Sequence, residues 1–460
     1  MKARFICDFD RISCSRWNCH LKWITRNKLD PLESAEQLQS DLEFCPPPKL
    51  MSELTKSDCF QVEKRITVVV GSGAVGLLYG SRLFEAERET VRCETETHFI
   101  CRRDFDHCSA YGIRMDSPDG NYFSGIGPSV ASRIHRDSTS ISTPARGVEW
   151  IICAVKSYSI NEQEGNSFRA LLQPMVGENT RILLIMNGLG CERHFREWFG
   201  ARSVFVGMAF TCVNRNNPNT IPPSAGQSRE EFVLVNHIAF GALLIGHCED
   251  DAAELSIASS LWSNTKIGSK VTVAPSLLRA QWSKLCWNIP FSGLCVALGG
   301  VTTDVIANDP DLRFLADKIM KDTISLANED ILKANEILTA IASSKSSTAQ
   351  SIDLLDADQV MPYCWNLTHS MGPYKPSTVL DLIGGNEMEL EYMFLYPLKR
   401  AQQISQARRS SIEGSHNSDE VTGMSDWPHL ETVVRQVSAM GRIAAEKRKR
   451  NIEWSPTFIM

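Results

Sequence analysis

The chain has 460 residues, enough for two folded cores, with 43% hydrophobic and 22% charged residues and a formal net charge of −6. This balance disfavours nucleic-acid binding, and no apolar run approaches the roughly 18 residues that a membrane span needs. The N-terminus lacks a signal-peptide pattern, so we expect a cytoplasmic protein; a mitochondrial location stays open, although early acidic residues disfavour a transit peptide.

The cysteines predict neither a disulfide framework nor a metal centre. Fifteen of them are scattered along the chain without paired C-x-x-C spacing, which favours reduced thiols. The densest group, Cys7, Cys14, Cys19 and His20, lacks four well-spaced ligands in an ordered fold, so we expect no metal there. Residues 1–62 lack periodicity and include Pro46-Pro47-Pro48, which predicts a largely disordered N-terminal extension.

A glycine-rich loop follows the first predicted strand. Residues 65–70 are a β-branched run that predicts a strand buried on both faces. The next residues begin a helix after a G-x-G-x-x-G spacing: Gly71, Ser72, Gly73, Ala74, Val75 and Gly76. This order is typical of dinucleotide binding, with the three glycines serving the tight turn, the approach of a pyrophosphate and helix packing, in that order. A glycine-rich turn without a ligand is the alternative.

Two arginines follow the second predicted strand, residues 98–101. An acid at this point of a dinucleotide fold binds the adenosine ribose and favours NAD, whereas a base accommodates the 2′-phosphate of NADP. Arg102 and Arg103 therefore favour NADP, with Arg102 as the phosphate contact, unless the pair is merely solvated.

Polar residues also follow two later buried strands. Residues 150–155 and 181–186 are apolar runs, and Lys156 and Asn187 come directly after them. Because open α/β sheets bind ligands at the carboxyl ends of their strands, both are candidate site residues. Residues 203–208 and 231–235 predict further strands, so we expect residues 63–274 to form a Rossmann-type dinucleotide-binding domain.

From about Pro275 helical periodicity replaces strand patterns, which predicts a mostly α-helical domain over residues 275–460 with a polar insertion at about 408–426. Within it, Lys284 and Asn288 are four residues apart on the predicted helix 278–291 and share a face. A lysine that only snorkels from an apolar surface is the alternative explanation.

Five motifs in this order resemble the ketopantoate reductase family: the glycine loop, Ala154–Lys156, Met186–Gly188, Trp282–Asn288, and Lys375–Asp381 through Glu389. The resemblance spans about residue 64 to about 400. It implies NADPH as cofactor and reduction of 2-dehydropantoate to (R)-pantoate on the route to pantothenate and coenzyme A. The partner is then a small-molecule 2-oxo acid, and a homodimer is a possible assembly.

The resemblance also implies residue roles. Lys284 matches the catalytic lysine, our general acid, and Glu389 matches the acid that binds the substrate hydroxyl and lies near that lysine. Asn288, Ser377 and Asn187 match substrate-binding residues. The cofactor contacts would be the glycine loop, Arg102, Lys156 and Asn187.

The pattern around Glu389 predicts an acid on the apolar face of a helix, with Tyr392 and Met393, paired to Lys284; Glu387 and Glu391 should be solvated. Pro397 should end that helix.

Ser292 stands where the family often has a second asparagine. Two alternatives therefore remain: a reductase of a different 2-oxo acid, or a non-catalytic NADP-binding sensor.

Overall fold

The computed structural model describes residues 64–89, 95–160, 165–216, 233–344, 351–413, 425–452 and 454. All of them belong to one compact unit, residues 62–460. The predicted N-terminal extension, its Cys7–His20 group and the centre of the 408–426 insertion lie outside the described residues.

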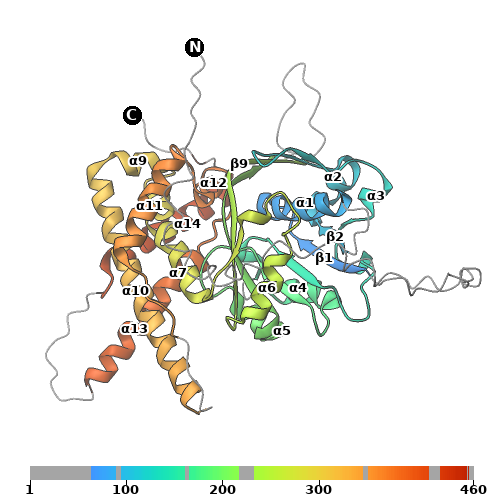
Figure 1. The fold of residues 1–460 in the computed structure, drawn as a ribbon. Coiled ribbons are helices and arrows are strands. Elements are labelled where there is room, and N and C mark those ends of the chain that lie inside the picture. Colours follow the sequence, from blue (N-terminus) through green and yellow to red (C-terminus); the bar gives the residue numbers. More distant parts are fainter. Residues whose placement is uncertain are drawn as a thin grey trace, which may run out of the picture. The chain divides into compact units, whose positions relative to one another are not determined.

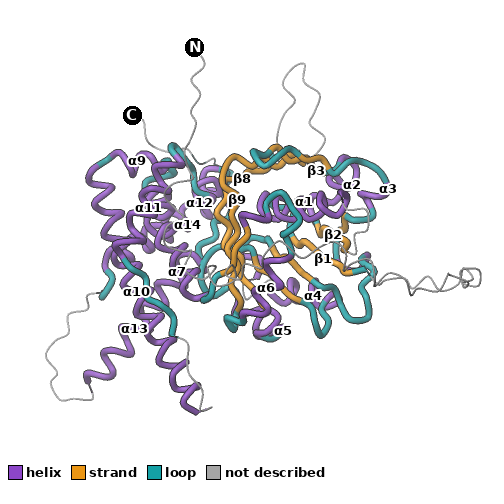
Figure 2. The backbone as a smooth tube through the Cα atoms, viewed as in Figure 1, coloured by secondary structure: helices purple, strands orange, loops and turns teal. Residues whose placement is uncertain are grey.

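The strands form one mixed sheet (Figure 2). Its order is β4-β3-β9-β8-β7-β6-β1-β2-β5, and β10 pairs with β9. Neighbours from β5 to β8 run parallel, whereas β8 and β9 are antiparallel. The strands described are β1 (Arg65–Val70), β2 (Thr95–Ile100), β3 (Ile113–Asp116), β4 (Tyr122–Phe123), β5 (Ile134–His135), β6 (Trp150–Cys153), β7 (Arg181–Leu184), β8 (Val204–Arg215), β9 (Val233–His247) and β10 (Val271–Val273).

Both faces of β1 are covered by apolar clusters. Val69 packs in the apolar cluster under α1, while Val68 and Val70 pack in a second cluster that includes Phe168 and Phe195. Successive strand side chains point to opposite faces, so a strand covered on both sides is mostly apolar on both; Thr67 is the buried polar residue of β1. The helices of this part are α1 (Ala74–Glu89), α2 (Phe105–Tyr111), α3 (Pro128–Ala131), α4 (Gly165–Leu172), α5 (Glu192–Phe199) and α6 (Ala252–Ser260).

The described residues after Leu277 form helices around a third apolar cluster (Figure 1). Trp282, Leu285 and Ile289 of the segment that carries Lys284 belong to this cluster. The helices are α7 (Leu277–Trp287), α8 (Gly293–Ala297), α9 (Thr303–Asn308), α10 (Pro310–Ser344), α11 (Ala357–Met371), α12 (Ser377–Ile383), α13 (Tyr396–Glu413) and α14 (Pro428–Lys449). An α/β part followed by a helical part confirms the predicted fold class.

Three local predictions around the site were wrong. The helix expected through Phe291 changes to a π-helix, η7 (Asn288–Ser292), because Pro290 has no N–H for the regular helical bond. Glu389 lies before the helical turns rather than on them: a π-helix, η8 (Glu391–Leu395), follows it, and α13 then begins at Tyr396. Pro397 does not end the helix as predicted: helical residues run without a break from Glu391 through η8 into α13, which continues to Glu413.

Candidate functional site

The glycine loop is shaped by two contacts within the protein. Gly71 has φ of +112°, and a Cβ there would lie 2.5 Å from the Ala154 carbonyl oxygen. A Cβ at Gly76 would lie 2.4 Å from the Gly71 carbonyl oxygen. At Gly73 the nearest atom to such a Cβ is 3.9 Å away. The fold thus requires glycine at the first and third positions, whereas the second borders open space, as the approach of a ligand would require.

This space suits an anionic group. The loop leads directly into α1, and the first-turn amides of a helix have no partners within the helix. Together with the positive end of the helix dipole they favour a phosphate. The glycine loop therefore has the form that a dinucleotide pyrophosphate needs.

At the end of β2, the chain passes through a short 3-10 helix, η1 (Arg102–Asp104). Arg102 and Arg103 are exposed, as expected of groups that could meet a phosphate. Asp104, which the sequence analysis did not consider, is buried and bonds both Ser72 and Arg215. Burial raises the pKa of Asp104, but these hydrogen bonds and the Arg215 charge outweigh it and leave the pKa below its ordinary value.

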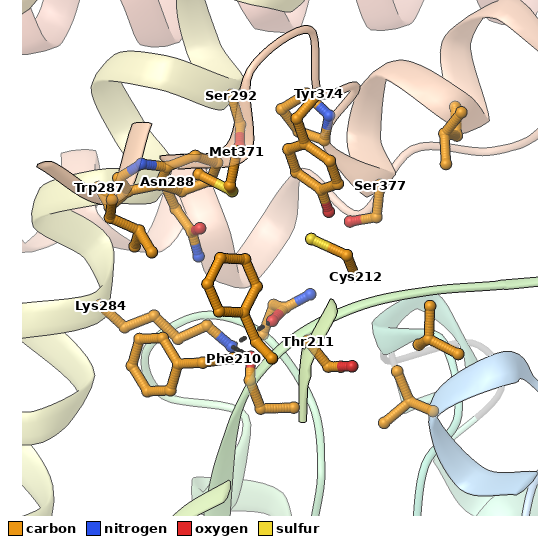
Figure 3. Close-up of a pocket in the computed structure, with 18 of the residues that line it drawn as sticks. Phe210, Thr211, Cys212, Lys284, Trp287, Asn288, Ser292, Met371, Tyr374 and Ser377 are labelled. Carbon is orange, nitrogen blue, oxygen red and sulfur yellow. Dashed lines mark hydrogen bonds between the residues drawn. The ribbon is translucent and has the colours of Figure 1, made fainter. Parts of the chain in front are cut away.

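Five of the predicted site residues line one pocket. Lys284, Asn288 and Ser377 are labelled in Figure 3, and Asn187 and Val75 complete the set. Val75 of the glycine loop lines the same pocket, so the pocket borders the predicted cofactor loop. Among the described lining residues, Lys284 alone carries a charge. Much of the remaining wall is apolar or aromatic: Phe210, Trp287, Leu367, Met371, Tyr374, Leu380 and Met393.

Lys284 is held at the pocket wall by two acceptors. Its Nζ donates to Asn187 Oδ1 at 2.8 Å and to the Ala209 carbonyl oxygen at 2.8 Å. Burial lowers the pKa of Lys284 to about 8, although the charge of Glu389 acts in the opposite direction. A lysine with a pKa near neutrality can both hold and release a proton at physiological pH.

Asn288 and Ser292 of the π-helix η7 line the pocket, and so does Ser377, the first residue of α12. Asn288 is buried, whereas Ser377 is exposed. These three residues thus bring an amide and two hydroxyl groups to the pocket that holds the Lys284 ammonium. A π-helix places successive residues differently from an α-helix and is frequent at functional sites.

Glu389 does not line this pocket, and its predicted pairing with Lys284 was wrong. Its Oε2 accepts from Lys156 Nζ at 3.1 Å, and its Oε1 accepts from the Ser157 backbone N–H at 2.8 Å. Glu389 precedes the helix on which it was expected, so its side chain turns toward the end of β6. Glu387 and Glu391 are exposed, as predicted.

Lys156 is engaged by two carboxylates. Besides Glu389 it donates to Asp381 Oδ2 at 2.7 Å. Burial lowers the pKa of Lys156, but the two acids outweigh burial and raise the pKa above its ordinary value. Sequence reasoning assigned no role to Asp381; its position four residues after Ser377, on the same helix, was the available signal.

Among the described residues no three metal-ligating side chains come together, and no helix is long and apolar enough to cross a bilayer.

Comparisons with known proteins agree with the fold and the motif order. The family model described as ketopantoate reductase PanE/ApbA matches residues 67–231, and the model of its C-terminal part matches residues 276–407. A 2-dehydropantoate 2-reductase from Nostoc sp. is 22% identical over 347 residues, covering 75% of this chain and 91% of that protein.

Solved structures share the fold. The 2-dehydropantoate 2-reductase from Geobacter metallireducens GS-15 has a TM-score of 0.60 and 24% identity, covering 81% of this chain and 99% of that one. D-mandelate dehydrogenase in a ternary structure with NADH and anilino(oxo)acetate has a TM-score of 0.58 and 15% identity, covering 83% and 99%. With both family models matched in order along one chain of this fold, the protein belongs to the ketopantoate reductase family.

Proposed function

We propose that this chain uses NADPH to reduce the ketone of a 2-oxo acid, with 2-dehydropantoate, reduced to (R)-pantoate, as the first candidate substrate. The observation that carries the proposal is the Lys284 ammonium, held at 2.8 Å from Asn187 in a pocket that also contains Asn288, Ser377 and, from the glycine loop, Val75. The family assignment supports the reaction class.

In this proposal Lys284 is the general acid. NADPH, when bound, would supply a hydride for the ketone carbon. The Lys284 ammonium would give its proton to the ketone oxygen, which gains negative charge as the hydride arrives. Before this transfer, the ammonium stabilises the developing charge. Asn187 and the Ala209 carbonyl keep Nζ in place, and the neutral amine that remains regains a proton from solvent.

Asn288 and Ser377 would orient the substrate. A 2-oxo acid carries a carboxylate next to its ketone, and both groups accept hydrogen bonds. The Ser377 hydroxyl and the Asn288 amide are donors at the pocket wall, so we assign Ser377 to the carboxylate and Asn288 to the region beside the ketone. A substrate fixed at both groups presents its ketone carbon in one orientation.

A 2-oxo acid other than 2-dehydropantoate is the second candidate substrate. The family-derived acid for a substrate hydroxyl, Glu389, bonds Lys156 and Ser157 instead of lining the pocket. Ser292 offers a hydroxyl where a second amide was expected. The largely apolar remaining wall would suit a substrate with an apolar chain better than one with a hydroxyl.

The test is oxidation of NADPH by the full chain, followed by absorbance, with 2-dehydropantoate, pyruvate, 2-oxoisovalerate and phenylpyruvate, and with NADH as cofactor control. We expect turnover of at least one acid. Faster turnover of another acid than of 2-dehydropantoate would favour the second candidate. Binding of NADPH without turnover of any acid would contradict catalysis and favour a sensor.

Lys284→Ala should lower kcat by about a hundredfold or more, because a positioned acid contributes on that scale. The affinity for NADPH, measured by nucleotide fluorescence, should change little. Lys321→Ala removes an exposed lysine of α10 and serves as the control with unchanged kcat. If Lys284→Ala lost cofactor binding rather than turnover, Lys284 would have another role.

A homodimer and a cytoplasmic location stay predictions. Light scattering of the full chain would measure the first, and imaging of the tagged protein the second.

A further inference from the structure

The carboxyl end of β2 carries two opposing signals for cofactor choice. Arg102 and Arg103 are exposed there, and Asp104 follows them directly. In dinucleotide-binding folds an acid near this point bonds the ribose hydroxyls of NAD, whereas an arginine accommodates the 2′-phosphate of NADP. An accessible Asp104 would therefore oppose the binding of NADPH.

The structure removes this conflict with a residue distant in sequence. Arg215, the last residue of β8, lies 111 positions from Asp104, and its Nη1 donates to Asp104 Oδ2 at 2.6 Å. Its Nη2 donates to Oδ1 at 3.3 Å, so both carboxylate oxygens are engaged. The Asp104 residue is only 8% exposed.

The same guanidinium also holds the glycine loop. Arg215 Nη1 donates to the Ser72 carbonyl oxygen at 2.8 Å, and the Ser72 hydroxyl donates to Asp104. Arg102, at the turn out of β2, has φ of +35°, an uncommon conformation for a residue with a side chain. The acid is thus turned inward at a turn that leaves both arginines exposed.

We propose that Arg215 is a positioning residue for cofactor choice, which acts through Asp104. By pairing with this carboxylate, it balances the negative charge at the end of β2 and leaves Arg102 and Arg103 to meet a 2′-phosphate. Without Arg215, Asp104 would lose this ion pair and keep the bond from the Ser72 hydroxyl. Its negative charge would then lie beside a site for a second anion, and like charges at short range repel. The inference rests on the proposed use of NADPH.

The experiment measures binding of NADPH and NADH to the full chain by nucleotide fluorescence, without substrate. Arg215→Ala should weaken NADPH binding by about tenfold and NADH binding by less than about threefold, because only NADPH carries the 2′-phosphate. The readout is the ratio of the dissociation constants for NADH and NADPH, because a general loss of structure would weaken the binding of both nucleotides and leave this ratio unchanged.

A second variant separates charge from packing. Adding Asp104→Asn to Arg215→Ala removes the negative charge that Arg215 no longer balances. The double variant should therefore regain most of the NADPH preference, even though neither side chain of the ion pair remains. Asp104→Asn alone should keep that preference, because Arg215 then adds positive charge.

The control is an ion pair of similar burial elsewhere in the sheet part. Arg181 Nε lies 2.6 Å from Glu254 Oε2, with side chains 19% and 15% exposed, against 17% and 10% for Arg215 and Asp104. Arg181→Ala should leave the nucleotide ratio unchanged.

An equal loss of both nucleotides in Arg215→Ala, no loss, or no rescue by Asp104→Asn would overturn the inference. Each result would leave the proposed reaction intact if the unaltered chain still oxidised NADPH. Binding of neither nucleotide to the unaltered chain would overturn both.

Discussion

The protonation of Lys284 should set the pH dependence of the reaction. Its pKa is lowered to about 8 by burial, and the protonated form is the acid in the proposed mechanism. The fraction of enzyme with a proton to donate is therefore full below pH 7 and falls as the pH rises through about 8. We expect kcat/KM for ketone reduction to decline tenfold per pH unit above that point. A profile measured from pH 6 to pH 10 tests this, and a level profile would contradict it.

A substitution at Glu389 tests whether Lys284 causes the decline of kcat/KM at high pH. The Glu389 carboxylate bonds Lys156 and Ser157 rather than Lys284, but its negative charge raises the pKa of Lys284. Glu389→Gln should therefore move the decline to lower pH while Lys284 remains in place. A shift toward higher pH would mean that another group titrates.

The glycine loop shows how far sequence reasoning reached at the level of an element. Its strand, its glycines and the start of α1 were predicted, because each depends on neighbours in sequence. The end of α7 was predicted as a continuous helix, because periodicity does not distinguish the π-helix η7 from α-helix around Pro290. The lengths of β8 and β9 were also underestimated, since polar residues such as Thr211 and Asn236 interrupt the apolar pattern.

Two glycines of this loop should respond differently to the same substitution. A Cβ at Gly76 would lie 2.4 Å from the Gly71 carbonyl, so Gly76→Ala should lower the free energy of unfolding by about 1–3 kcal/mol. At Gly73 the nearest atom is 3.9 Å away, so Gly73→Ala should keep the melting temperature but obstruct the pyrophosphate. Thermal melts and NADPH titrations of both variants test the difference. Normal NADPH binding by Gly73→Ala would place the cofactor elsewhere.

At the scale of the whole molecule, the partners that sequence reasoning missed are all distant in the chain. Lys284, Asn288 and Ser377 were found because motifs mark them, and the fold brings them to one pocket. The partners of Lys156 were not found: Asp381 and Glu389 lie 225 and 233 positions away. Neither periodicity nor spacing indicates which cation a buried acid will meet. The predicted pairing of Glu389 with Lys284 therefore rested on the family resemblance and on the cost of leaving an acid unpaired on an apolar face.

The cluster of Lys156, Asp381 and Glu389 connects the sheet part with the helical part. Lys156 follows β6, whereas Asp381 lies on α12 and Glu389 precedes η8. Both acids are buried, at 9% and 6% exposure, while the Lys156 side chain keeps 37%. Removing one partner of a buried ion pair leaves a charge without compensation, which costs several kcal/mol when the pair is fully buried.

Lys156→Ala should therefore lower the free energy of unfolding by roughly 2 kcal/mol, less than for a fully buried pair because the lysine is partly solvated. Burial raises the pKa of Asp381 and Lys156 opposes this rise, so the variant raises that pKa further. A group with a raised folded-state pKa stabilises the fold when protonated and loses this contribution as the pH rises. The difference in Tm between variant and unaltered chain should accordingly shrink from pH 8 to pH 5.

Lys270→Ala is the matched control, because Lys270 is similarly exposed, at 33%, and pairs with one carboxylate, Asp119, at 2.6 Å. Lys270 connects elements of the sheet part only. Its removal takes one lysine from Asp119, which keeps His237 Nδ1 at 3.8 Å, whereas Lys156→Ala takes the lysine from two carboxylates. We expect a smaller loss of stability from Lys270→Ala at pH 8. Adding Asp381→Asn to Lys156→Ala should recover part of the lost Tm at pH 8 and little at pH 5. Equal losses at both pH values would mean that Lys156 stabilises the junction by packing of its aliphatic chain rather than by charge.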